Sequence, residues 1–216
     1  MTIHRPGRPE DLPDARTLWG RWAFIAALQA NSRDEAQGYG RTGYWIDGEG
    51  LHWDDSACTV WTLTSMGEGR FLLYGEEEVS ELRFCDPPVD VLAGGPEWLP
   101  FDKLRELYED FRAGTVYWYE EGAWGRAVYP DDLGDDGLSS GLHGVIDRDE
   151  LLLELVPHLE MAPGGPDVDN LLADAEAYRL DSQLLFGRLR PGPPYNVEPD
   201  IAAVTRTLAA SGITVQ

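Results

Sequence analysis

Residues 43–74, GYWIDGEGLHWDDSACTVWTLTSMGEGRFLLY, decide the fold class of this chain. Aromatic and β-branched residues gather in short runs, and glycine-containing turns separate these runs. This pattern predicts a series of antiparallel strands joined by hairpins. The expected strands lie near residues 44–46, 51–53, 59–64 and 70–74.

The segments on both sides extend this prediction. A further strand is expected at residues 81–85 and a second hairpin at residues 115–119 and 124–129, whereas residues 131–144 are expected to form a polar, glycine-rich loop. Apolar residues at helical spacing predict helices near residues 13–30, 101–111, 148–156, 171–189 and 201–211. Because strands are bunched rather than alternating with helices, the sequence predicts an α+β fold with an antiparallel sheet of roughly five to seven strands.

The length of 216 residues favours a single domain over residues 1–216. Its expected parts are an N-terminal helix (13–30), a sheet-rich acidic part (43–130) and a helical C-terminal part (147–212).

Negative charge is concentrated in one region of the chain. The net charge is −22, and residues 43–165 hold twenty-seven Asp and Glu against seven Lys and Arg. Six of the eight tryptophans lie in the same region. Such a field repels nucleic acid and anionic lipid and attracts basic proteins. Adaptation to high salt and simple solubility explain the same charge, and composition alone does not separate these explanations.

Several short motifs resemble catalytic or metal-binding patterns but have the wrong context. The string Gly137-Leu138-Ser139-Ser140-Gly141 matches G-x-S-x-G, yet an acidic loop rather than a strand precedes it. The segment 132–143 has Gly at the third position and His at the twelfth position of a calcium loop, where acidic ligands are expected. The segment 38–43 matches G-x-G-x-x-G, but it follows a helix and precedes a strand, the reverse of a dinucleotide site. We therefore expect no catalytic residue, metal or cofactor.

The remaining features indicate an intracellular protein. Cys58 and Cys85 are expected to be buried free thiols, because two cysteines form neither a disulfide framework nor a metal quartet. No apolar run approaches the length of a membrane span. We expect a cytoplasmic monomer or homodimer that binds neither nucleic acid nor membrane.

The favoured hypothesis is a protein-binding module that sequesters a basic protein partner, as an immunity protein or a nucleic-acid mimic does. Carboxylates accept bidentate arginine, and tryptophan faces attract guanidinium groups. The alternatives are a metal-assisted hydrolase that uses the acidic loop 131–136 and a structural protein whose charge serves solubility. The candidate binding residues are acids and tryptophans expected near one edge of the sheet: Trp53, Asp54, Asp55, Glu76, Glu77, Trp124, Asp131 and Asp132.

Overall fold

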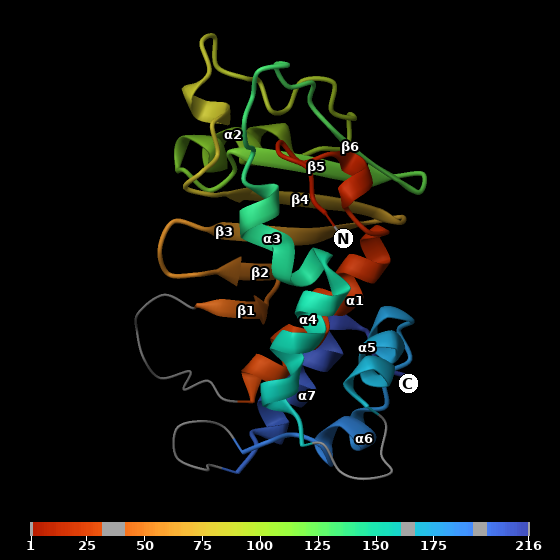
Figure 1. The fold of residues 1–216 in the computed structure, drawn as a ribbon. Helices are drawn as coiled ribbons and strands as arrows, with labels where there is room; N and C mark the ends of the chain where they lie inside the picture. The colour runs from red at the N-terminus through yellow and green to blue at the C-terminus, as the bar shows by residue number, and fades with distance from the viewer. Residues whose placement is uncertain (1, 32–41, 161–166, 192–197, 216) are drawn as a thin grey trace.

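The computed structural model describes residues 2–31, 42–160, 167–191 and 198–215. The strands form a single antiparallel sheet in the order β1-β2-β3-β4-β5-β6, with helices across its face and further helices beyond its β1 side (Figure 1). The α+β class and the antiparallel sheet that the sequence predicts are confirmed. The strands are β1 (Gly43–Ile46), β2 (Leu51–Asp54), β3 (Val60–Gly67), β4 (Arg70–Glu76), β5 (Thr115–Glu120) and β6 (Ala123–Arg126).

Most helices follow the sheet in the chain, as predicted. The α-helices are α1 (Ala15–Ala30), α2 (Phe101–Glu109), α3 (Leu138–Ile146), α4 (Arg148–Leu155), α5 (Val168–Glu176), α6 (Ser182–Phe186) and α7 (Ile201–Ser211). Short 3-10 turns are η1 (Pro9–Asp11), η2 (Leu82–Phe84) and η3 (Val156–His158). Among the described residues, no helix has both the length and the apolar character needed to cross a membrane.

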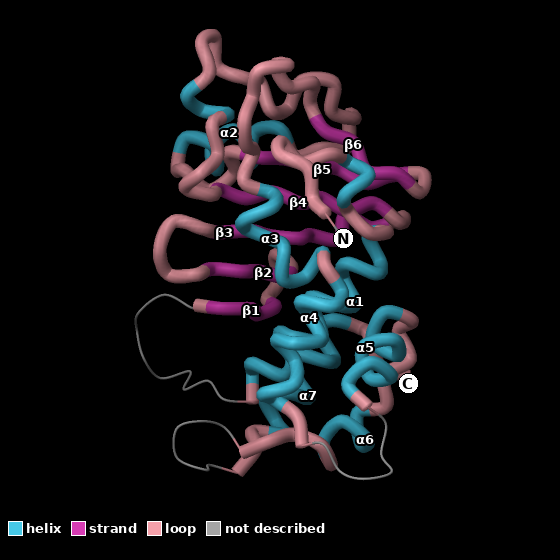
Figure 2. Tube along the Cα trace, viewed as in Figure 1, coloured by secondary structure: helices cyan, strands magenta, loops and turns pink. Residues whose placement is uncertain are grey.

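The two faces of the sheet contribute to two hydrophobic cores. Along β4, Phe71 and Leu73 enter the larger core with α1 and α3, whereas Leu72 and Tyr74 enter a second core with α2. Side chains of a strand alternate between faces, so the central strands are covered on both sides. In Figure 2 the chain above the β6 side of the sheet is mainly loop rather than helix.

Helix α1 is buried almost all round because it lies between the sheet and the C-terminal helices. The Asp14 carboxylate caps its first turn by accepting hydrogen bonds from the backbone of Arg16 (3.0 Å) and Thr17 (3.4 Å). One charged residue, Arg21, is buried in its middle. Arg21 donates from Nε to Glu176 of α5 (2.7 Å) and from Nη1 to the carbonyl of Ile146 (2.6 Å).

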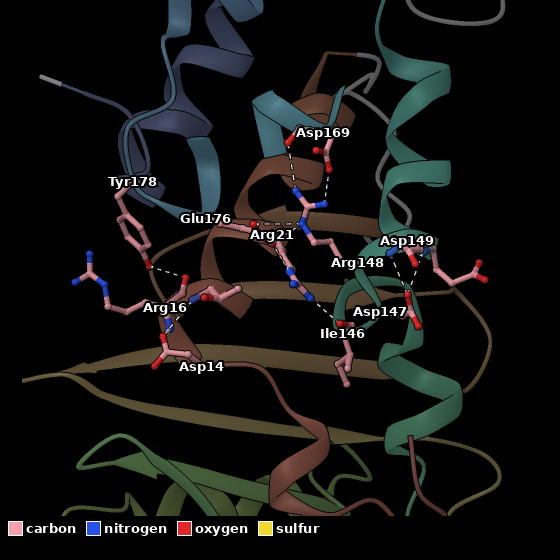
Figure 3. Close-up of polar contacts among 12 residues, drawn as sticks. Asp14, Arg16, Arg21, Ile146, Asp147, Arg148, Asp149, Asp169, Glu176 and Tyr178 are labelled. Carbon is pink, nitrogen blue, oxygen red and sulfur yellow. Dashed lines mark hydrogen bonds and ion pairs between the residues drawn. The ribbon is translucent and has the colours of Figure 1, made fainter. Parts of the chain in front are cut away.

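A second arginine extends this polar contact. Arg148 of α4 bonds both Glu176 and Asp169, so a chain of alternating charges joins α1, α4 and α5 (Figure 3). The charge of Arg21 is therefore paired rather than left alone in the interior.

Four local expectations are wrong. Residues 81–85 contain the 3-10 turn η2 (Leu82–Phe84) instead of a strand, and residues 138–146 form helix α3 instead of a loop. The helix expected over 171–189 is divided into α5 and α6, because Tyr178 adopts a φ of +57° and Leu180 pairs with Thr214 in an isolated bridge. The cysteines are not buried: Cys58 is exposed and Cys85 is half-buried.

Candidate acidic binding edge

The candidate acids Asp54 and Glu76, with Asp55 and Glu77 next to them in sequence, lie at the same edge of the sheet. Val60, at the start of β3, pairs with Asp54 on β2 and with Glu76 on β4. Because neighbouring strands run in opposite directions, the ends of β2 and β4 meet the start of β3 at the same edge. The segments that follow, with Asp55 and Glu77, continue from that edge.

Local hydrogen bonds hold these carboxylates in place. Asp55 accepts from the backbone of Ala57 (2.8 Å) and Thr59 (3.1 Å), and the Thr59 hydroxyl donates to Glu77 (3.4 Å). Partial burial acts to raise the pKa of Asp55, but the hydrogen bonds from Ala57 and Thr59 outweigh it and leave the pKa below its usual value. Asp55 is therefore an exposed, ionised and oriented acceptor.

Asp54 is fixed in a similar way, whereas Glu76 differs from its neighbours. Asp54 accepts from the backbone of Ser56 (2.6 Å). Glu76 forms a two-pronged ion pair with Arg83, with contacts of 2.6–3.0 Å, and the Arg83 guanidinium also lies 3.9 Å from the ring centre of Tyr108. Glu76 thus has an internal cationic partner, and we do not include it in the proposed contact surface.

The two candidate tryptophans are not brought together. Trp53 on β2 and Trp124 on β6 are four strand spacings apart, which is roughly 19 Å. Trp53 is half-buried and stacks on Tyr44 with 4.3 Å between ring centres. Trp124 is only 9% exposed, and its indole N–H donates to the carbonyl of Pro13 (2.7 Å). Because Trp124 is buried, it has little surface for an external guanidinium and is not part of the contact surface.

Asp131 and Asp132 lie exposed in the segment that follows β6. This segment is fastened to the one that follows β4, because Glu81 donates its backbone N–H to the carbonyl of Asp135 (3.0 Å) and accepts from the backbone of Gly134 (2.9 Å). Residues 76–81 therefore connect the strand-end acids to the 131–135 segment. We call this surface the acidic edge; it comprises Asp54, Asp55, Glu77, Glu78, Glu81, Asp86, Asp131 and Asp132.

A groove with a volume of about 750 Å³ lies between the two fastened segments. Its walls come from residues 81–93 and 128–133. Four carboxylates line it, and none of its fourteen lining residues is Lys, Arg or His. Phe84 on one wall and Val128 on the other are 81% and 92% exposed. We call it the acidic groove; its lining is Glu81, Phe84, Cys85, Asp86, Pro87, Pro88, Val89, Asp90, Ala93, Val128, Tyr129, Pro130, Asp132 and Leu133.

Of the residues that line this groove, only Asp132 is among the binding residues predicted from the sequence. The sequence predicts a strand at residues 81–85, which would place Phe84 on one face of a sheet rather than on the wall of a groove. The signals that were present are the pair Pro87-Pro88 and Pro130, which restrict the backbone and exclude regular strand pairing.

The catalytic and metal motifs have structural roles instead. Gly137 has a φ of +86° at the start of α3, and Gly141 lies against Trp61, so backbone conformation explains the first glycine of the G-x-S-x-G string and packing explains the second. Asp136 of the expected acidic loop is fully buried and accepts from the backbone of Gly7 (2.8 Å) and the hydroxyl of Tyr117 (2.6 Å). Most of the G-x-G-x-x-G segment lies outside the described residues.

Comparisons with protein-family models, with curated proteins and with solved structures all find no similarity to this chain. The function therefore has to be inferred from the chemistry of the surface.

Proposed function

We propose that this chain is a binding protein that sequesters a basic protein partner, as an immunity protein or a nucleic-acid mimic does. The observation that carries the proposal is the acidic groove, where carboxylates and two strongly exposed apolar side chains meet without a basic residue in the lining. Complementary charge accelerates encounter and selects the partner, while buried apolar contacts prolong the complex.

Two features favour this proposal over the metal-assisted hydrolase. The hydrolase needs the carboxylates of residues 131–136 to converge on a metal, but Asp136 points its oxygens at protein donors in the interior. Asp135 is also mostly buried and accepts from the backbone of Gly137 (2.8 Å). The exposed members, Asp131 and Asp132, suit recognition of an external cation better than assembly of a closed metal site.

The test is capture of partners from a native lysate at low salt, followed by elution with a salt gradient and mass spectrometry. We expect one dominant basic protein that elutes as rising salt shortens the Debye length from about 30 Å at 0.01 M to about 10 Å at 0.1 M. A variant that neutralises four acids of the edge should weaken the isolated complex by about 2 kcal/mol, or roughly thirtyfold. Its substitutions are Asp54→Asn, Asp55→Asn, Glu77→Gln and Asp132→Asn.

These amides keep an acceptor oxygen for the local backbone bonds. A matched control removes the same amount of charge from exposed acids elsewhere: Glu68→Gln, Glu97→Gln, Asp102→Asn and Glu106→Gln. We expect this control to lose less than threefold in affinity. Equal losses in both variants would mean that only net charge matters, and a diffuse mixture of salt-labile proteins would contradict the proposal and favour the solubility role.

A further inference from the structure

We infer that the acidic groove is the docking site for an extended, arginine- or lysine-rich segment of the partner that carries one apolar anchor residue. This inference rests on the proposed function and specifies which part of the acidic edge makes the central contact. It also specifies the chemistry of the bound segment, which net charge alone does not.

The charge of the groove selects a cationic occupant. Asp86 and Asp90 lie on one wall and Asp132 on the other, and Glu81 joins the two walls. Two arginines of the same region are already bound: Arg83 pairs with Glu76, and Arg126 donates to the carbonyls of Gly7 and Ala127. Within the part of the chain that the structure describes, no ion pair neutralises a carboxylate of the groove, although Glu81 and Asp90 accept backbone hydrogen bonds. Arginine can engage a carboxylate through two parallel hydrogen bonds.

The apolar side chains of the groove call for an apolar anchor in the same segment. Phe84 and Val128 lie on opposite walls with most of their surface exposed, although neighbouring residues of both walls belong to the second core. By contrast, Leu82, two residues before Phe84, and Leu133, on the same wall as Val128, are at most 6% exposed. An apolar side chain placed between Phe84 and Val128 would remove surface of both from water, which stabilises a complex in proportion to the area buried.

The placement of the acids favours an extended occupant. Successive side chains of an extended chain point to opposite sides. Of two adjacent basic residues, one can therefore reach the Asp86 wall and the other the Asp132 wall. The walls are restrained before binding, since three prolines limit their backbone and buried Leu82, Val91 and Leu133 anchor them in the second core. Restrained walls lose little conformational entropy on binding.

The two cysteines provide a direct test in the unmodified full-length protein. Cys85 lines the groove, whereas Cys58 is exposed in the turn between β2 and β3, beside Asp54 and Asp55. The probe is a nine-residue peptide, acetylated and amidated, with four arginines, four glycines and a central leucine. The measurement is the rate of alkylation of each cysteine by neutral iodoacetamide, followed by peptide mass spectrometry, with affinity measured by titration calorimetry.

We expect the saturating peptide to slow alkylation of Cys85 at least fivefold and that of Cys58 less than twofold. Replacing the central leucine with alanine should weaken binding about fivefold, and replacing the arginines with glutamates should abolish it. Phe84→Ala should weaken binding of the leucine peptide about fivefold without affecting the alanine peptide. Asp86→Asn with Asp90→Asn should weaken both peptides about equally, by about fivefold.

The outcomes separate this inference from the proposed function. Salt-dependent binding with equal protection of both cysteines, or with no protection of Cys85, would overturn the groove while leaving a basic partner for the acidic edge. Equal affinity for the leucine and alanine peptides would overturn the apolar anchor. Absence of peptide binding at low salt would overturn the groove, and the lysate experiment then decides the proposed function on its own.

Discussion

Gly141 allows helix α3 to lie directly on the sheet. A Cβ atom at this position would overlap Nε1 of Trp61 and lie 2.9 Å from its Cδ1, and Trp61 is itself 1% exposed. No real Cβ atom tolerates such contacts, so either the indole or the helix would have to move. The second glycine of the G-x-S-x-G string is therefore required by packing, which a pattern search cannot distinguish from a catalytic requirement.

This contact gives a prediction at the scale of one residue. Gly141→Ala should lower the free energy of unfolding by about 1–3 kcal/mol through overpacking, measured by urea denaturation. Gly187→Ala is the matched control, because Gly187 has an ordinary φ of −68° and its nearest neighbours would be 3.7 Å from the new Cβ. The control should be neutral or stabilising by about 0.4–1 kcal/mol. Equal losses in the two variants would show that Trp61 does not restrict the site.

At the scale of elements, a chain of charged side chains through Arg21, Glu176 and Arg148 joins helices α1, α4 and α5. Arg21 and Glu176 have side chains that are 10% and 18% exposed, so removal of one partner leaves a mostly buried charge. Arg21→Ala should therefore cost about 3–5 kcal/mol of unfolding free energy, measured by chemical denaturation. Arg16→Ala in the same helix is the control: Arg16 is exposed, lies 4.2 Å from the ring centre of Tyr178, and should cost less than about 1 kcal/mol. A loss below 1 kcal/mol for Arg21→Ala would contradict this account.

The elements that sequence reasoning predicted are those with strong local signals. The hairpins of residues 43–76 combine β-formers with glycine turns, and α1 has both a capping Asp14 and a long apolar run. Helix α3 was missed because its glycines and serines have low helix propensity, and burial of Leu138, Leu142 and Val145 overrides that propensity. The break between α5 and α6 was missed because apolar spacing continues across it, whereas the positive φ of Tyr178 has no local signal.

At the scale of the whole molecule, the sequence predicts which region carries the negative charge, but it does not predict which segments meet to form the groove. The adjacency of Asp54 and Glu76 follows from counting antiparallel strands, which the hairpin pattern makes possible. The groove requires residues 81–93 to meet residues 128–133, and the contacts through Glu81 that join them span more than fifty positions of sequence. The indole N–H of Trp124 likewise donates to the carbonyl of Pro13, which lies 111 positions earlier in the chain. Long-range contacts of this kind leave no periodicity in the sequence.

The charge itself affects the stability of the folded state. A net charge of −22 on an accessible surface of 11183 Å² is about one net negative charge per 500 Å², so the compact state is opposed by self-repulsion. Raising NaCl from about 0.02 to 0.3 M should screen this repulsion and raise Tm by roughly 3–6 °C, which corresponds to about 1–2 kcal/mol for a chain of this size. Differential scanning calorimetry measures this directly.

The concentration range of the effect distinguishes two origins of the acidity. Screening is largely complete once the Debye length falls to about 8 Å near 0.15 M, so the rise in Tm should level off by about 0.3 M. The two variants in which four acids are replaced by amides have a smaller net charge. Their Tm should rise less with salt, because less repulsion remains to be screened. A Tm that begins to rise only above about 1 M, where the Debye length is about 3 Å, would contradict screening and indicate adaptation to high salt. In that case capture of a basic partner would have to be measured at the higher ionic strength. There, charge–charge attraction is screened, and only apolar contacts with Phe84 and Val128 would be unaffected.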